Sequence, residues 1–88
     1  MKATTYINKF KKENGTQDIM KIFMADDLLS NKDSIAAIVC AEPRTTKETL
    51  AGKPIKWVVY IYREILDDLS IMHFDDLKKA CDYAREIL

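Results

Sequence analysis

The C-terminal third of the chain, residues 56–88, constrains the fold more than any other segment. An apolar run over residues 57–63 leads through a short turn into a segment whose apolar residues recur at the i, i+3, i+4, i+7 spacing of an amphipathic helix. The apolar positions of this segment are Leu77, Ala80, Cys81, Ala84, Ile87 and Leu88. The polar positions are Asp76, Lys78, Lys79, Asp82, Arg85 and Glu86. The pattern predicts a helix with one core face and one solvent face, capped by Asp75 or Asp76.

The run before this helix predicts a central β-strand, because it is apolar on both of its faces. Trp57, Val59 and Ile61 alternate along it with Val58, Tyr60 and Tyr62. Asp67-Asp68 marks a turn, and residues 69–73 then return as another strand. If the last helix covers the Trp57 face of the sheet, the tyrosine face is either covered by the N-terminal segment, with Tyr6, Phe10 and Phe23, or contacts a partner.

The N-terminal third has two interpretations. In the first, residues 5–14 form a helix capped by Thr4 or Thr5 and ended by Gly15, and residues 16–30 form a second helix. In the second, Asn14-Gly15 is a type I′ turn of a β-hairpin that pairs Phe10 with Ile19. We favour two helices, because the segment from Lys21 to Leu29 continues a helical pattern better than a strand.

The middle of the chain predicts one further strand and a long connection. Residues 35–41 are apolar and bounded by Asp33 and Pro43, which is typical of a buried strand. In the connection that follows, Thr45 and Glu48 have capping-box spacing, and Gly52 can end a short helix over residues 46–51. The expected fold is a single α+β domain, residues 1–88, with the order α-α-β-β-β-α and a three-stranded antiparallel sheet packed by the C-terminal amphipathic helix.

Composition and charge exclude several classes of function. The 88 residues are 48% hydrophobic, which indicates a folded chain, and 14 basic and 14 acidic residues cancel to a net charge of zero. No overall field therefore attracts nucleic acid or anionic lipid. No apolar run is long enough for a secretory signal or a membrane span, so we expect a cytoplasmic protein. Cys40 and Cys81 lie in apolar patterns, and we expect two free thiols.

No group of residues forms a recognisable reactive centre. His73 lies near Asp75 and Asp76, but a general base needs a positioned nucleophile or substrate, and none is evident. The three Asp-Asp pairs lack the ligand pattern of a calcium loop and fall where helices and turns are expected to begin. The two glycines are isolated, so no phosphate-binding loop exists. We expect no enzyme activity, no cofactor and no metal.

The final α-β-β-β-α part of the expected order is similar to that of double-stranded RNA-binding domains, in which the start of the last helix contacts phosphates. The likeness is one of element order alone. Lys78 and Lys79 begin the last helix here, but Asp75 and Asp76 precede them and would repel a phosphate. Nucleic-acid binding is therefore the alternative rather than the expectation.

Binding to another protein remains as the expected function. Short chains without reactive residues are often inhibitors, from phages or mobile elements, of a host protein, for example a defence protein, and the expectation rests on this analogy. Aromatic and arginine side chains are enriched at interface hot spots, and basic side chains steer association. The expected partner-binding residues are Tyr60, Tyr62, Arg63, Arg44 and Lys47. A homodimer is a further possibility.

Overall fold

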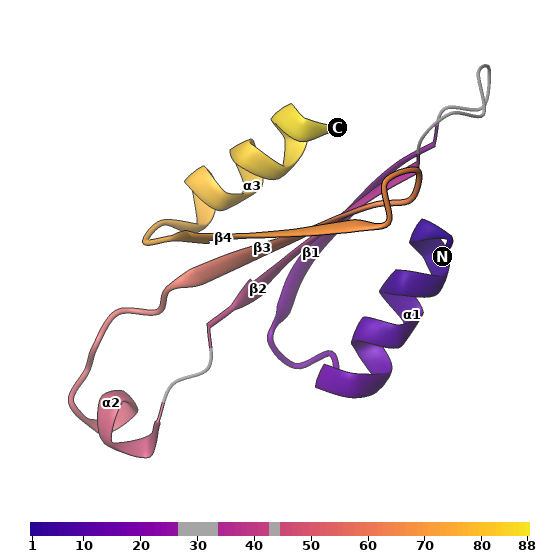
Figure 1. Cartoon of the computed structure of the whole chain (residues 1–88). Coiled ribbons are helices and arrows are strands. Elements are labelled where there is room, and N and C mark those ends of the chain that lie inside the picture. Colours follow the sequence, from indigo (N-terminus) through magenta and orange to yellow (C-terminus); the bar gives the residue numbers. More distant parts are fainter. Residues whose placement is uncertain (27–33, 43–44) are drawn as a thin grey trace.

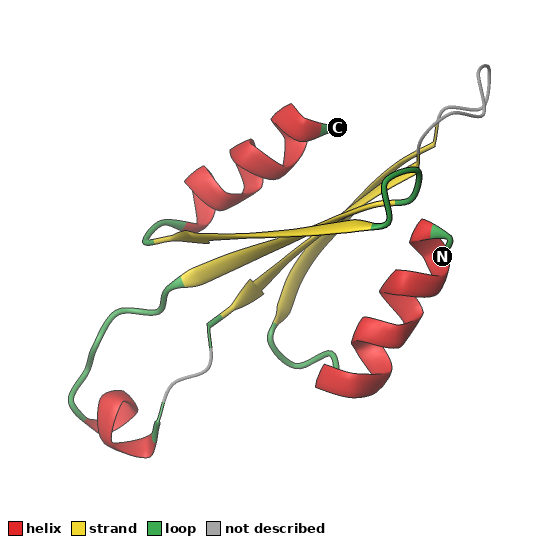
Figure 2. Ribbon diagram, in the orientation of Figure 1, coloured by secondary structure: helices red, strands yellow, loops and turns green. Residues whose placement is uncertain are grey.

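The computed structural model describes residues 1–26, 34–42 and 45–88 of the chain. The elements in chain order are α1 (Ala3–Asn14), β1 (Ile19–Asp26), β2 (Ser34–Ala41), α2 (Thr46–Leu50), β3 (Trp57–Arg63), β4 (Asp68–Phe74) and α3 (Leu77–Ile87). The four strands form one antiparallel sheet in the order β1-β2-β3-β4. Figures 1 and 2 show α1 and α3 on opposite sides of this sheet, which gives three layers.

The expected α+β class is confirmed, but the expected order and strand number are wrong. Ile19–Asp26, expected in a second helix, is an edge strand, so the sheet has four strands instead of three. Nearly every residue of this segment is apolar, and such a run satisfies the helical and the strand period alike. The sheet decides between them, because β1 can place Ile22 on one face and Phe23 on the other. The rest of the expected second helix, residues 27–30, lies outside the described part of the chain.

The hairpin interpretation of the N-terminus is also wrong, because Ala3–Asn14 is a helix. This helix ends as expected at Gly15, whose φ of 73° favours glycine and whose N–H donates to the Lys11 carbonyl. It begins earlier than expected, at Ala3, with Lys2 rather than Thr4 or Thr5 at the N-cap.

The N-terminus of α1 is capped from a distant part of the chain. Lys2 makes no side-chain capping bond, and the Ala3 N–H instead donates to Glu64 Oε2 at 3.1 Å. Glu64 follows β3, so its carboxylate satisfies one free N–H of the helix and complements the positive end of the helix dipole. This contact joins α1 to the turn between β3 and β4.

The other helix boundaries follow the sequence signals. Asp76 caps α3 by accepting from the Lys78 N–H at 2.8 Å. Thr45 and Glu48 form the expected capping box of α2, and Gly52 follows with φ of 70°. These signals act within four residues along the chain, which is why the sequence reveals them.

Each face of the sheet has its own hydrophobic cluster. The α1 cluster contains Ala3, Tyr6, Ile7, Phe10, Ala36, Ile38, Cys40, Val58 and Tyr62. The α3 cluster contains Ala37, Val39, Val59, Ile61, Ala80 and Ala84, with Trp57 packed against it. The expected assignment of the two faces of β3 is therefore confirmed. Phe23, expected under α1 with the tyrosines, lies on the α3 side instead.

The position of Ala84 predicts a severe effect of a charge on α3. Ala84 is fully buried against the sheet, so Ala84→Glu would place a carboxylate in the core without a partner and should cost roughly 3 to 5 kcal/mol. Lys79→Glu, at an exposed position of the same helix, is the control and should melt close to wild type. Equal melting temperatures for the two variants would contradict the assigned face of α3.

The Glu64 contact predicts a measurable loss when the carboxylate is removed. Glu64→Ala should lower the free energy of unfolding by about 1 kcal/mol, because α1 then lacks its capping acceptor. Glu86→Ala removes an exposed carboxylate from α3 and serves as the control in urea titrations. If the two variants unfold at the same urea concentration, Glu64 does not cap α1.

Candidate functional site

The helix α1 covers only part of its face of the sheet. It packs mainly over β2 and less over β3, with Tyr6, Ile7 and Phe10 directed into the α1 cluster. On this same face β4 carries Leu69 and Ile71, which the strand register places beside Tyr62 and Tyr60. Leu69 and Ile71 are 45% and 48% exposed. The half of the face that extends from Tyr60 to β4 is therefore open, whereas Val58 and Tyr62 of β3 are buried.

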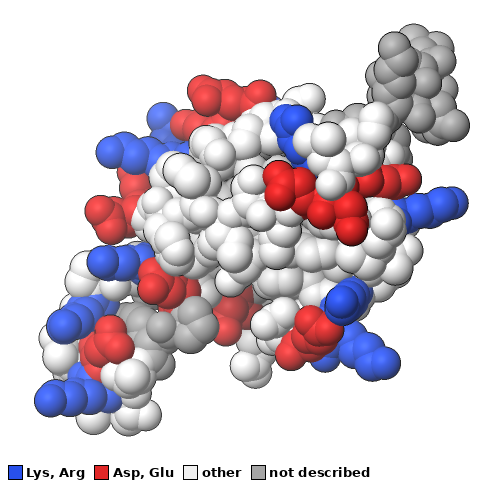
Figure 3. Space-filling model, in the orientation of Figure 1, with Lys and Arg blue, Asp and Glu red and all other residues white. Residues whose placement is uncertain are grey.

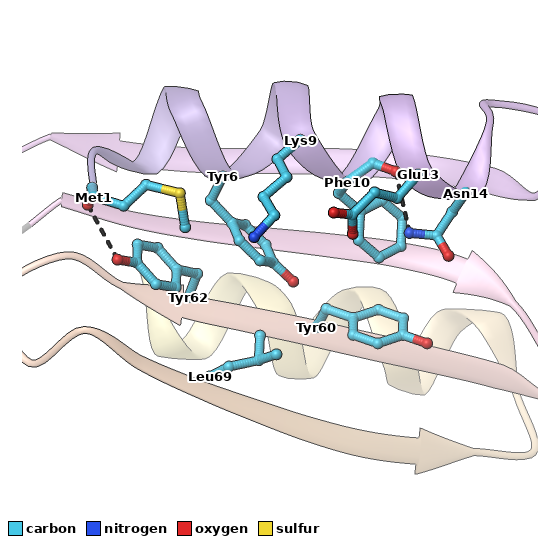
Figure 4. A pocket seen from close by; sticks show the side chains of 9 residues that line it. All are labelled: Met1, Tyr6, Lys9, Phe10, Glu13, Asn14, Tyr60, Tyr62 and Leu69. Atoms are coloured by element: carbon cyan, nitrogen blue, oxygen red, sulfur yellow. Dashed lines mark hydrogen bonds between the residues drawn. The ribbon is translucent and has the colours of Figure 1, made fainter.

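A groove of about 390 Å³ follows the boundary between α1 and this open half of the face. Figure 4 shows the N-terminus and α1 as one wall and the side chains of β3 and β4 as the floor. The wall is formed by Met1, Tyr6, Lys9, Phe10, Glu13 and Asn14. The floor is formed by Tyr60, Tyr62 and Leu69. The groove is thus apolar and aromatic below, with one basic and one acidic side chain on its helical wall.

Stacked aromatic rings hold the wall and the floor together. The rings of Tyr6 and Tyr62 lie nearly parallel with centroids 4.8 Å apart, and those of Phe10 and Tyr60 are tilted with centroids 5.0 Å apart. The Tyr62 hydroxyl has two acceptors, the Met1 carbonyl at 3.1 Å and the Asp67 carboxylate. The hydrogen bond to Asp67, followed by burial, raises the pKa of Tyr62 to about 12. Tyr62 is thus a structural residue that fixes the N-terminus of α1 to the β3–β4 turn.

Tyr60 is the aromatic side chain of the floor that stays accessible. It is half-buried, and its pKa is raised by burial and then by the neighbouring Cys40 and Glu42. Ile71 lies directly opposite Tyr60 on β4. Tyr60, Leu69 and Ile71 together form an apolar strip along the open half of the face, the β3–β4 strip.

Of the four described residues that were expected to bind a partner, the structure brings Tyr60 and Tyr62 together in the groove. Tyr60 and Tyr62 both line the groove, although Tyr62 is almost fully buried. Arg63 is the last residue of β3, whereas Lys47 lies on α2, in the connection that leads to the first residue of β3. Six strand steps of about 3.3 Å separate these two ends of β3. Arg44 lies outside the described residues.

The residues that sequence reasoning missed are Leu69 and Ile71. Their signal was present, because residues 69–74 carry apolar side chains at Leu69 and Ile71 on one face and at Met72 and Phe74 on the other. On the α3 side Phe74 contacts Tyr83, with ring centroids 5.2 Å apart. On the α1 side no element of the described chain covers Leu69 and Ile71 to a similar extent.

Groups that can perform chemistry are scattered. The Nδ1 atom of His73 lies 3.8 Å from Glu42 Oε2, at an exposed position. Cys40 is buried beside α1, with its pKa raised by burial, and Cys81 lies on the opposite face of the sheet. Both thiols are free. Among the described residues, no three His, Cys, Asp or Glu side chains gather closely enough to hold a metal ion.

The described helices are all too short or too polar to cross a membrane. No protein-family model, curated protein or solved structure matches the chain. The residues and their geometry are therefore the basis for the function proposed below.

The buried tyrosines predict a loss of stability at alkaline pH. Burial, followed by the neighbouring Tyr60, Cys40 and Glu13, raises the pKa of Tyr6 from its ordinary value of 10.0 to about 12. Between these values the unfolded state releases the Tyr6 proton first, so stability is complete below pH 10 and falls as the pH rises toward 12. The contribution of Tyr6 is at most about 2.7 kcal/mol, and screening by solvent lowers it further.

Tyr6→Phe removes the contribution of Tyr6 to the pH dependence of stability and keeps the ring that stacks on Tyr62. Urea titrations at pH 8 and pH 11 should show a smaller loss of stability between the two pH values for Tyr6→Phe than for wild type. Parallel pH dependences of the two proteins would show that Tyr6 does not titrate differently on unfolding.

Proposed function

We propose that this protein acts without catalysis, by binding another protein in the groove between α1 and the β3–β4 strip. The observation that carries the proposal is the exposure of Leu69 and Ile71 next to Tyr60, on a face whose other half is covered by a helix. An apolar strip of this kind beside a rigid aromatic wall is typical of a binding surface. Figure 3 shows an uncharged area in the middle of one side of the molecule, with charged side chains around it.

The partner that fits this surface best is an amphipathic helix. A sheet floor next to an existing helix offers the place of a second helix, and a helical partner would complete the layer that α1 begins. The apolar stripe of such a helix would contact Tyr60, Leu69 and Ile71, while Lys9 and Glu13 would meet polar residues at the margin. Tyr60 is the expected anchor, because it is aromatic, half-buried and held by Phe10.

This proposal changes the set of residues expected from the sequence. Tyr62 supports the groove from below instead of anchoring a partner, and Leu69 and Ile71 join Tyr60. Arg63 ends β3 and Lys47 lies on α2, and neither residue lines the groove, so the proposed site does not include them. Inhibition of a host protein, as expected from the analogy with phage and mobile-element proteins, would then consist of occupying that protein's helical segment.

RNA binding is less well supported. The Lys78 and Lys79 side chains are exposed at the start of α3, but the carboxylate of Asp76 caps this helix and Asp75 is exposed beside it. A phosphate approaching this turn would meet two carboxylates. The sheet also has one strand more than the α-β-β-β-α order requires.

The proposal predicts that one charge in the groove floor abolishes capture of the partner. Wild-type protein, Leu69→Glu and Met24→Glu, each with an affinity tag, are compared by mass spectrometry of the proteins that co-purify. Met24 on β1 is the matched control, because it is 44% exposed and Leu69 is 45% exposed. A partner should co-purify with wild type and Met24→Glu and be lost with Leu69→Glu.

Once this partner is identified, surface plasmon resonance with dilute protein gives the size of the effect. Leu69→Glu should weaken binding by at least about 30-fold, mostly through faster dissociation, because a carboxylate would be desolvated in the interface. If Leu69→Glu keeps the wild-type melting temperature and binds the partner with wild-type affinity, the partner does not bind in the groove.

A further inference from the structure

The two edges of the sheet differ in how they are protected. At an unprotected edge, free backbone N–H and C=O groups can pair with another strand, and natural proteins block this with bulges, charges or proline. The β1 edge has such protection, since its register shifts between Ile19 and Lys21 and the Lys21 side chain is exposed. The β4 edge is regular over its full length, because all seven of its residues pair with β3 without a shift in register.

The β4 edge also lacks charged side chains over most of its length. Residues 69–74 contain no Lys, Arg, Asp, Glu or Pro, and the five residues 69–73 are all exposed. Leu69 and Ile71 project on the α1 side, and Met72, 42% exposed, projects on the α3 side. An exposed, regular and apolar edge of this kind is the structural feature that accepts an added strand.

We propose that the strand added at this edge is β4 of a second copy, so that two chains form one continuous eight-stranded sheet. Antiparallel pairing about a two-fold axis perpendicular to the sheet keeps the α1 sides of both copies on the same side. The axis must then lie midway between one residue and the same residue of the second copy. With the axis at Ser70, Leu69 pairs with Ile71 of the second copy, and Ile71 with its Leu69. With the axis at Ile71, Leu69 would instead pair with His73, and Asp68 with Phe74.

The register at Ser70 therefore joins apolar side chains to apolar side chains on the α1 side. The one ionised side chain of the paired segment, Asp68, lies at its end opposite Met72, and the zero net charge of the chain produces no overall repulsion between copies. The self-complementarity follows from the sequence of β4 itself, which is the reason for choosing a second copy over a foreign strand. The inference goes beyond the proposed function and stands whether or not a foreign protein occupies the groove.

The expected interface is small. With the axis at Ser70 the paired segments comprise five residues of each copy, 68–72, and with their flanking side chains they cover less than the about 800 Å² per partner that stable interfaces bury. The dimer should therefore depend on concentration, with dissociation in the micromolar range or weaker.

Analytical ultracentrifugation from about 1 to about 500 μM tests the proposal. Wild type should shift from monomer toward dimer as its concentration rises. Ser70→Lys and Ser70→Glu should each stay monomeric, because like charges then face each other across the axis, and an equimolar mixture of the two should dimerise again. Met24→Lys and Met24→Glu on the β1 edge are the controls and should dimerise as wild type does.

Wild type that stays monomeric at every concentration would overturn the proposal. So would Ser70→Lys that dimerises as wild type does, or a mixture that stays monomeric while both variants keep wild-type circular dichroism. Ser70 is exposed on the α3 side of the sheet, opposite Ile61, and so lies outside the groove. Ser70→Lys should accordingly still capture the groove partner, which separates failure of the dimer from failure of the proposed function.

Cross-linking tests the register. In a Cys81→Ser background, which leaves the buried Cys40 as the native thiol, Ser70→Cys should form a disulfide-linked dimer under mild oxidation, since position 70 faces itself across the axis. Ile71→Cys in the same background should cross-link more slowly. Faster cross-linking at position 71 would overturn the register at Ser70.

Discussion

The rest of the structure depends on the central pair of strands, β2 and β3, which are apolar on both faces. Ile38, Val39 and Val59 are fully buried, and Ile38 faces α1 while Val39 and Val59 face α3. A sheet whose middle strands are apolar on both sides needs cover on both sides. The chain provides it with one helix from each end, which explains why α1 and α3 lie on opposite faces although they are the first and last elements (Figure 2).

The two helices cover their faces in different ways because their contact residues differ in size. On α3 the buried residues are Ala80 and Ala84, which allow a close approach, and this helix contacts all four strands. On α1 the contacts are large rings, Tyr6 and Phe10, which meet Tyr62 and Tyr60 and leave the β4 side uncovered. Among the described residues, no other helix packs over the β4 side of this face to a comparable extent. The groove and the exposed side of β4 are thus consequences of how α1 packs.

Local signals in the sequence revealed much of this fold. The alternation in residues 57–63, the spacing of apolar residues on α3, the Thr45 capping box and Gly15 each act within a few residues. Residues 19–26 could not be assigned in this way, because a run that is apolar at almost every position fits a helix and a strand. Pairing with β2 determines that this run is a strand. The Glu64 cap of α1 was likewise beyond prediction, since its partner Ala3 is 61 positions away.

For the candidate site the sequence identified Tyr60 but grouped it with residues from another part of the sheet. Antiparallel pairing of β2 with β3 places the connection that carries Lys47 at the Trp57 end of β3, away from Arg63 at the other end. The chain order alone predicts this position, because the connection leads into the first residue of β3. The exposure of Leu69 and Ile71 could not be predicted from the chain order, because it depends on where α1 lies across the sheet.

The groove and the β4 edge share one strand, and this has a consequence for how partners could be arranged. A two-fold axis perpendicular to the sheet would keep both α1 helices on the same side, so the two β3–β4 strips would lie next to each other between them. Two helical segments of a partner could then bind side by side across the joined sheet. Each copy alone would offer one weak site, and a partner with two linked segments would gain affinity through the effective concentration of the second segment. Dimerisation and partner binding would in that case strengthen each other, because the linked partner favours the state in which both strips are adjacent.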